Sequence, residues 1–183
     1  LAYAFEGLPF SVAEENLQSR IRGGLVMAYA NKFNKLVLNT SNKSELATGY
    51  GTLYGDMIGG LSILGDLYKT QVYELAHYIN TNTTVIPISI IEKAPSAELR
   101  PNQKDSDSLP EYEILDTILF QLIEEQASVE QVIKNGFDEK LVKRTAHLLT
   151  QNEYKRNQFC PILRVSSKSF GSGRRIPIVA KLY

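Results

Sequence analysis

Residues 36–60 constrain the fold of this chain more than any other segment. They begin with three apolar residues, 36–38, which give way to polar ones from Asn39. A short apolar run before a polar break is typical of a fully buried parallel strand. In open α/β sheets, ligands bind beyond the carboxyl ends of the strands, where the next helix presents unpaired N–H groups. We therefore expect the polar residues after this strand to border a binding site.

Glycine is dense in the second half of the same segment. Five of the twelve residues at positions 49–60 are glycines, and Tyr50, Tyr54 and Asp56 lie between them. Glycine loses more conformational freedom on folding than any other residue, so such density indicates a backbone that turns tightly or lies close to a ligand.

Composition limits the class of protein. A chain of 183 residues with 43% hydrophobic content can form one domain with a substantial core, and we predict a single domain over residues 1–183. The formal net charge is zero, which predicts neither nucleic-acid nor membrane partners. No apolar run approaches the length of a membrane span. The single cysteine, Cys160, excludes an internal disulfide and favours a reducing, cytoplasmic location.

A long helix is predicted near the start of the chain. Ser11 and Glu14 have the spacing of a capping box, and a helical apolar pattern continues over residues 12–32. Gly23 and Gly24 lie inside this helix and should each cost about 1 kcal/mol relative to alanine. We therefore expect a neighbouring helix packed backbone to backbone, or a partner subunit, at these glycines.

Four further helices are predicted downstream. Thr70 is expected to cap a helix whose apolar stripe covers one face of the sheet. Ser108 and Glu111 again have capping-box spacing, before a helix that faces the core. Residues 128–134 and 138–156 form the last two helices. The core-facing residues expected after Glu111 are Ile114, Leu115, Ile118, Leu119 and Leu122.

Three segments have weaker patterns. Residues 85–91 are apolar and β-branched, but Pro87 lacks an N–H for a sheet, so a central strand there is doubtful. Residues 92–110 contain three prolines and no periodicity, which is typical of a functional lid or of disorder. A short strand is expected at 162–165.

Four motifs resemble the synthetase domain of NAD synthetases, most of all the form fused to a glutamine-hydrolysing domain. The resemblance extends from Glu15 to Pro177. It implies an α/β, parallel-sheet fold of the adenine-nucleotide alpha-hydrolase-like (pyrophosphatase-loop ligase) type, in three layers. The family's SGGxDS loop lies upstream of these motifs and is absent here, so this fold is expected to be incomplete at its N-terminus, as the C-terminal portion of the amidating domain. The motifs are NTSNKSELATGYGTLYGDMIGG (39–60), GDLYKTQVYELA (65–76), PSAELRPNQKDSDSLP (95–110) and NEYKR (152–156).

The resemblance implies a reaction in NAD biosynthesis. The family amidates deamido-NAD⁺ to NAD⁺ through an adenylated intermediate, with ATP as co-substrate and Mg²⁺ as cofactor, and releases AMP and pyrophosphate. The nitrogen comes from free ammonia or from glutamine-derived ammonia. The family also implies a homodimer, with the first long helix at the interface. Without the SGGxDS loop, the 183-residue chain alone is expected to have negligible activity.

Site residues follow from the same resemblance, and no catalytic residue is assigned. Residues 92–110 would be a mobile active-site loop. Glu45 would bind Mg²⁺ as well as substrate. The ATP-binding residues would be Thr40, Lys69 and Ser96. The deamido-NAD⁺-binding residues would be Asn16, Arg20, Glu45, Tyr50, Gly51, Thr52, Leu53, Tyr154 and Lys155.

By themselves the residues leave alternatives open. Glu45 has capping-box spacing with Asn42, so it could serve a helix rather than a metal. Lys69 lies beside a helix start, where the dipole disfavours a cation, and this hints at an anionic ligand. Lys155 lies near a predicted helix C-terminus, where a basic residue is stabilising anyway. Thr40 could simply begin a turn, and a solvated helix face would explain Asn16 and Arg20 equally well.

Two other functions remain possible at this point. One is a different pyrophosphatase-loop ATP-dependent ligase. The other is a nucleic-acid-binding module, since residues 155–183 contain seven Lys or Arg and no acid. Such a module would bind nucleic acid with an affinity that falls steeply with salt.

Overall fold

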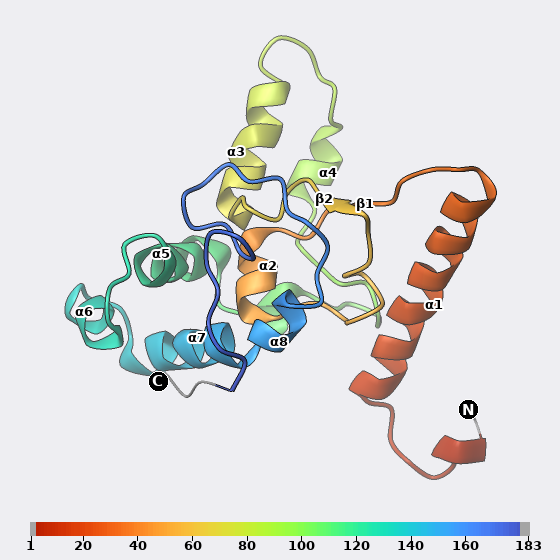
Figure 1. Ribbon diagram of the computed structural model, residues 1–183, viewed down its shortest axis with the longest axis horizontal. Coiled ribbons are helices and arrows are strands. Elements are labelled where there is room, and N and C mark those ends of the chain that lie inside the picture. Colours follow the sequence, from red (N-terminus) through yellow and green to blue (C-terminus); the bar gives the residue numbers. More distant parts are fainter. Residues whose placement is uncertain (1–2, 180–183) are drawn as a thin grey trace.

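A two-stranded parallel sheet lies between helices α1 and α2 (Figure 1) in the computed structural model, which describes residues 3–179. Strand β1 (Leu38–Asn39) pairs with β2 (Leu61–Ser62), and Leu38 lies opposite Leu61. Ile162 forms a parallel bridge to Ser62, within the segment expected to be a strand. The ends of the predicted domain and of the basic tail, at 1–2 and 180–183, lie outside the described residues.

The prediction of a fully buried strand at 36–38 was wrong. The strand begins two residues later, and the side chains of Leu36 and Leu38 are 65% and 49% exposed. The sheet of the described residues has only these two strands, and no element covers these leucines. The expected parallel sheet is present, but most of the regular structure is helical.

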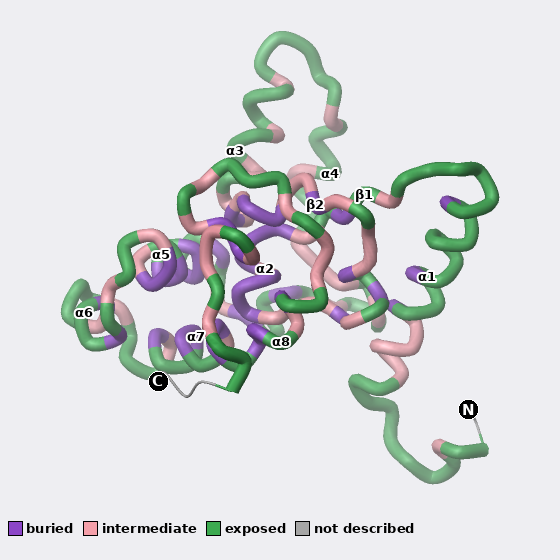
Figure 2. The backbone as a smooth tube through the Cα atoms, in the orientation of Figure 1, coloured by how far each residue is buried: buried purple, intermediate pink, exposed green. Residues whose placement is uncertain are grey.

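Helix α1 (Val12–Lys32) stands apart from the other helices (Figure 1), and most of its surface is exposed (Figure 2). It follows a short 3₁₀ helix, η1 (Tyr3–Phe5), and the predicted capping box of Ser11 and Glu14 is present. A Cβ atom on Gly23 would lie 2.9 Å from the carbonyl oxygen of Gly55, whereas Gly24 faces open space. A backbone-to-backbone contact is therefore present at Gly23, but its neighbour is the glycine-rich segment and not the expected helix.

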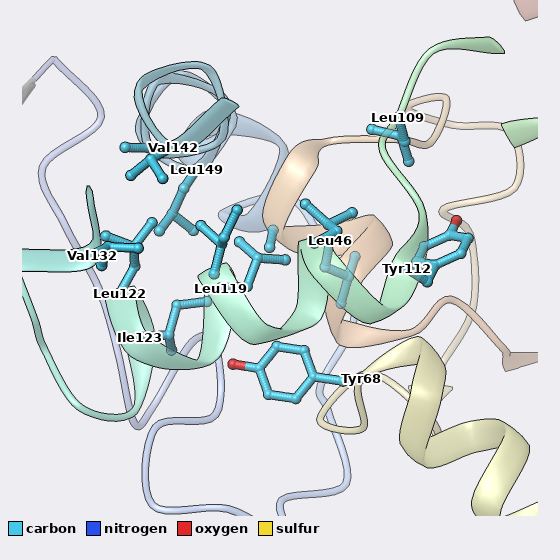
Figure 3. Close-up of a cluster of buried hydrophobic side chains, with 14 of the residues drawn as sticks. Leu46, Tyr68, Leu109, Tyr112, Leu119, Leu122, Ile123, Val132, Val142 and Leu149 are labelled. Carbon is cyan, nitrogen blue, oxygen red and sulfur yellow. The ribbon is translucent and has the colours of Figure 1, made fainter. Parts of the chain in front are cut away.

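The core is formed by helices that pack around α2 (Lys43–Thr48). Helices α5 (Tyr112–Ile123) and α7 (Glu139–Gln151) pack against α2 and against each other, and α6 (Val129–Lys134) packs on both (Figure 3). Four of the five predicted core residues of α5 are buried, and Ile114 is 45% exposed on its outer side. Among residues 3–179, no helix is both long and apolar enough to cross a membrane.

The beginnings of two helices differ from the predictions. Helix α3 (Lys69–Ile79) starts before Thr70, whose backbone N–H and hydroxyl both donate to Asp116 at 2.9 Å, so Thr70 is not a cap. Helix α3 packs mainly on α5 and α2 rather than covering the sheet. Helix α5 begins after Glu111 without a side-chain cap, so the predicted capping box at Ser108 was wrong.

Three other segments can be compared with their predictions, and only the last differs from its prediction. The doubtful strand is a short helix, α4 (Ile88–Glu92). Residues 93–110 contain only the 3₁₀ helix η2 (Asp105–Asp107) as regular structure. The helix predicted over 138–156 is divided at Asn152 into α7 and α8 (Glu153–Arg156). The side-chain amide of Asn152 donates to the carbonyl oxygens of Thr48 and Leu148, both at 2.9 Å.

A buried ionic network attaches the C-terminal segment to α2. The ammonium group of Lys43 is fully buried, 2.9 Å from a carboxylate oxygen of Asp66 and 2.5 Å from one of Glu124. Asp66 also accepts the backbone N–H groups of Val165 and Ser166. Burial by itself would raise the pKa of Asp66, but the Lys43 ammonium and these N–H donors hold it below its usual value.

Candidate active site

A cavity of about 560 Å³ opens beyond the carboxyl end of β1. Its walls come from α1, from the turn after β1, from the glycine-rich segment, from the start of α3, from residues 96–105 and from Lys155. These segments lie far apart in the sequence. The predicted site residues that line the cavity are Asn16, Thr40, Glu45, Tyr50, Gly51, Thr52, Lys69, Ser96 and Lys155.

The other three predicted site residues lie outside this cavity. The exposed Arg20 side chain donates from Nε to the carbonyl oxygen of Leu53 at 3.1 Å. The Leu53 side chain packs on the hydrophobic core, and Tyr154 is exposed. The structure therefore does not bring these residues together with the rest of the site.

Glu45 and Lys69 form a partly buried ion pair at one wall, with side chains 19% and 20% exposed. A carboxylate oxygen of Glu45 lies 3.4 Å from the ammonium nitrogen of Lys69. The same carboxylate accepts the backbone N–H of Asn42 at 3.1 Å, so the capping box is present as well. Burial raises the pKa of Glu45, and the Lys69 charge offsets part of this effect. Glu45 therefore both caps α2 and faces the cavity.

Lys69 is the first residue of α3. As predicted, its positive charge lies at the end of the helix where the dipole disfavours a cation. Its ammonium nitrogen lies 5.9 Å from the ring centre of Tyr73 and 5.5 Å from that of Tyr112. Its backbone N–H donates to the hydroxyl of Ser44 at 2.9 Å. Aromatic faces attract a cation, so the aromatic residues and Glu45 together compensate for its unfavourable position.

Lys155 supports the glycine-rich segment from the opposite side. Its ammonium group donates to the carbonyl oxygens of Gly49 and Gly51, at 2.7 and 2.8 Å. Gly49 ends α2 in the left-handed conformation, with φ +69°, and a Cβ there would overlap the Asn152 side chain. Burial lowers the pKa of Lys155, and the charge of Asp56 opposes this shift. An ammonium group has three donors, so Lys155 keeps one for a ligand.

Helix α1 contributes a polar edge to the cavity. The hydroxyl of Thr52 donates to Asn16 at 2.7 Å. Asp56 accepts the hydroxyl of Ser19 at 2.7 Å and the backbone N–H of Thr52 at 2.9 Å. A Cβ atom on Gly55 would lie 2.2 Å from the Ser19 hydroxyl oxygen. The helix and the glycine-rich segment therefore hold each other in place through hydrogen bonds and close backbone packing.

Sequence reasoning missed several polar residues of the cavity. Asp56 was noticed only as a neighbour of glycines, although a carboxylate within a glycine-rich segment is itself a signal of a site. Asp105 lies in the segment without periodicity, where no pattern could single it out. The cavity residues missed are Glu15, Asp56, Gln103 and Asp105.

The oxygen ligands of the cavity could supply only part of the coordination of a hard cation such as Mg²⁺. Glu45 offers carboxylate oxygens, which Mg²⁺ prefers, and Mg²⁺ is commonly held by one or two carboxylates together with substrate phosphates. Within residues 3–179 there is no group of three or more histidine, cysteine or acidic residues arranged to hold a metal. Glu45 fits Mg²⁺ as one ligand, and a bound phosphate would have to supply others.

Replacing Glu45 by glutamine is expected to stabilise the fold most at high pH. Since burial raises the Glu45 pKa, the wild-type protein loses stability as the pH rises through that value, whereas glutamine does not titrate and can still cap α2. Urea unfolding at about pH 5 and about pH 8 measures the difference. The exposed Glu125→Gln is the control. An E45Q gain no larger at the higher pH would contradict the expectation.

A polar cavity at the carboxyl end of a parallel strand, with a partly buried lysine and carboxylate on its wall, is an arrangement typical of nucleotide-binding α/β domains. A family model described as NAD synthase matches residues 2–159. The chain therefore belongs to the NAD synthase family, as its motifs predicted.

Individual relatives agree with this assignment. A glutamine-dependent NAD(+) synthetase from Synechocystis is 53% identical over 174 residues, which are 95% of this chain and 31% of that protein. The structure of glutamine-dependent NAD+ synthetase from Acinetobacter baumannii in complex with ADP is 45% identical, with a TM-score of 0.50, and the match covers 97% of this chain and 32% of that one. An NMN synthetase from Francisella tularensis is 28% identical, with a TM-score of 0.67, over 84% of this chain and 58% of that one. The chain spans about a third of the length of its glutamine-dependent relatives.

Proposed function

We propose that this chain carries most of the substrate-binding cavity of an NAD synthetase, a ligase that uses ATP to amidate deamido-NAD⁺. The observation that carries this proposal is the gathering of nine predicted site residues, from segments far apart in the sequence, around one polar cavity. The ADP complex of the Acinetobacter baumannii relative supports ATP as the co-substrate.

The chemistry explains why the cavity needs buried positive charge. Ammonia does not attack a carboxylate directly, because oxide is too poor a leaving group. Adenylation of the carboxylate makes AMP the leaving group instead. The protein must hold the carboxylate in line with the α-phosphate and stabilise charge that develops toward pyrophosphate. We assign Lys69 to stabilise the charge that develops toward pyrophosphate. Thr40 and Ser96 are assigned as further ATP contacts. In a cavity with little water, one fixed cation has a large effect.

We assign Glu45 as one ligand of Mg²⁺, because its carboxylate oxygens fit that ion. When bound, Mg²⁺ would neutralise charge on the phosphates of ATP. Asn16, Tyr50, Gly51 and Thr52, with the third N–H of Lys155, would hold the dinucleotide. The corresponding roles of Arg20, Leu53 and Tyr154 stay predictions.

Several wider features belong to the same proposal. Residues 92–110 act as a mobile loop that excludes water from the reactive adenylate. The chain is a single domain of the C-terminal portion of the amidating domain, in a three-layered fold of the adenine-nucleotide alpha-hydrolase-like type. The nitrogen donor is ammonia, free or derived from glutamine as the names of the glutamine-dependent relatives indicate. A cytoplasmic location also stays a prediction.

The reaction can be tested with purified full-length protein. With ATP, Mg²⁺ and ammonia or glutamine, we expect NAD⁺ to form from deamido-NAD⁺ together with AMP and pyrophosphate. The 183-residue chain alone should give negligible NAD⁺. No NAD⁺ from the full-length protein under any nitrogen source would contradict the proposal.

A second candidate substrate is suggested by the Francisella relative, whose name indicates NMN as the product. The deamido form of NMN, supplied in place of deamido-NAD⁺ in the same assay, separates the two ligase functions by the product formed. Binding of nucleic acid by the basic tail is the remaining alternative, and a filter-binding titration at two salt concentrations tests it.

We propose that α1 forms the interface of a homodimer. Large apolar side chains are exposed on it at helical spacing, including Ile21, Leu25 and Tyr29, and Gly24 beside them faces open space. Such a surface is unfavourable in water and is suited to a second copy of the same helix.

Replacing Leu25 by glutamate is therefore expected to shift the protein from dimer to monomer, because the new charge would be buried without a partner. Light scattering after size-exclusion chromatography measures the mass. Tyr78→Glu, at an equally exposed apolar residue of α3, is the control and should stay dimeric. A dimeric L25E protein would contradict the assignment of the interface to α1.

A further inference from the structure

Asp105 is a buried carboxylate within an irregular, partly exposed segment. It is 6% exposed, and one carboxylate oxygen accepts the hydroxyl of Tyr112 at 2.7 Å. Its other oxygen is also buried and has no hydrogen-bond partner among the described residues. A buried carboxylate oxygen without a donor is unfavourable, so it calls for a donor that another state of the site supplies.

The backbone of Asp105 closes residues 95–105 into a loop. Its N–H donates to the carbonyl oxygen of Pro95 at 2.9 Å, and its own carbonyl accepts the N–H groups of Ser108 and Leu109. Ser96 and Gln103, which line the cavity, lie within this loop. The position of Asp105 therefore determines where these two side chains face the cavity.

Asp105 also separates two cavities. It lines the site cavity of about 560 Å³ and a neighbouring cavity of about 650 Å³ between α3, α4 and the start of α5. Tyr112, at the start of α5, lines only the second cavity, and Tyr50, in the glycine-rich segment, lines only the first. Tyr50 and Asp105 line the same cavity; burial raises the pKa of the Tyr50 hydroxyl most, and the charge of the Asp105 carboxylate raises it further.

Helix α1 holds the same loop from the opposite direction. The side chain of Gln18 donates to the carbonyl oxygen of Leu99 at 3.0 Å, and that of Arg22 to the carbonyl oxygen of Glu98 at 3.1 Å. These contacts involve the exposed middle of the loop, whereas Asp105 fixes its buried end. The loop is therefore held both by α1 and by Asp105. At Asp105, one buried carboxylate oxygen has no hydrogen-bond donor among the described residues.

We propose that Asp105 is a positioning residue that latches residues 95–109 over the cavity, with the Tyr112 hydroxyl as its fixed partner and the Tyr50 hydroxyl as the donor that its second oxygen gains on closure. This inference rests on the proposed function only in taking an adenine nucleotide as the ligand that drives closure. Asp105 need not touch the nucleotide, because it acts by placing Ser96 and Gln103.

Hydrogen exchange of the full-length protein, with and without ADP, tests the latch. In wild type, ADP should slow amide exchange over 96–109. In Asp105→Asn and in Tyr50→Phe, this protection should fall by about tenfold, which is the effect of losing one hydrogen bond to a charged group. Asp107→Asn is the matched control, since its exposed carboxylate contacts only Arg100 and the backbone of Lys104.

Each outcome decides the question. Unchanged protection over 96–109 in both D105N and Y50F would overturn the latch. Faster exchange in α7 as well would show that D105N loosens the whole fold, and Y50F, which removes only a hydroxyl, would then decide. If wild type binds no ADP, the proposed function fails, and the latch is judged on exchange in the free protein: faster exchange over 96–109 in D105N than in D107N supports it, and equal exchange overturns it.

Discussion

Lys69→Met is expected to lower kcat/KM for ATP in the amidation reaction by about 10²- to 10³-fold, which is the loss typical of removing one preorganised group that stabilises developing charge. Methionine keeps most of the length of the side chain and its apolar part, but it lacks the ammonium group that lies over the rings of Tyr73 and Tyr112 and 3.4 Å from Glu45. The change therefore removes the positive charge at the cavity wall with little loss of packing.

Three measurements separate this effect from unfolding. The thermal midpoint of K69M should stay within a few degrees of wild type, because the ion pair is only partly buried. Lys143→Met, at an exposed lysine paired with Glu139 on α7, should leave activity unchanged. Activity of K69M within a factor of three of wild type would exclude Lys69 from the ATP site.

Lys43→Met is expected to lower the free energy of unfolding by about 3–5 kcal/mol, the cost of breaking a buried ion pair on one side. The substitution would leave the carboxylates of Asp66 and Glu124 in the interior without their shared cation. Hydrophobic burial of the methionine would offset only part of this, because two charges remain unpaired.

Urea unfolding followed by circular dichroism measures the loss. The double variant K43M/D66N should recover part of it, because one of the two carboxylates is then neutral. Lys143→Met again serves as the exposed control. A loss below about 1 kcal/mol, the median for surface pairs, would show that Lys43 does not carry the stability of this network.

Local patterns predicted those parts of the fold that local interactions determine. The capping boxes at Ser11 and Asn42 and the helix after Ser128 depend on residues three positions apart, and each is present. Helix α3, by contrast, begins where Asp116 binds Thr70, a residue 46 positions away in the sequence. Asn152 likewise divides two helices by reaching Thr48, 104 positions away. No window of the sequence contains both members of either pair.

The candidate site likewise contains residues that sequence patterns predicted and residues whose contacts they did not predict. The strand-end rule and the motifs led to Thr40, Glu45 and Lys69, which the fold brings to one cavity. Arg20 was assigned to the dinucleotide from the resemblance, and its side chain donates to the carbonyl oxygen of Leu53 outside the cavity, so that role stays a prediction. Lys43, one of the polar residues expected to border the site after the first strand, does not line the cavity; it is fully buried and pairs with Asp66, whereas a lysine in a polar turn is ordinarily exposed.

The contact of Gly23 with Gly55 limits how far α1 and the glycine-rich segment can move relative to each other. Two main chains meet there with no side chain between them, so no rotamer change can absorb a tilt of α1. Any such tilt would displace Gly55 and, with it, Asp56 and Thr52. A side chain at position 23 or 55 would not fit without a shift of one of the two segments, although neither residue lines the cavity, and a force on the outer face of α1 would reach the cavity as a movement of the backbone itself.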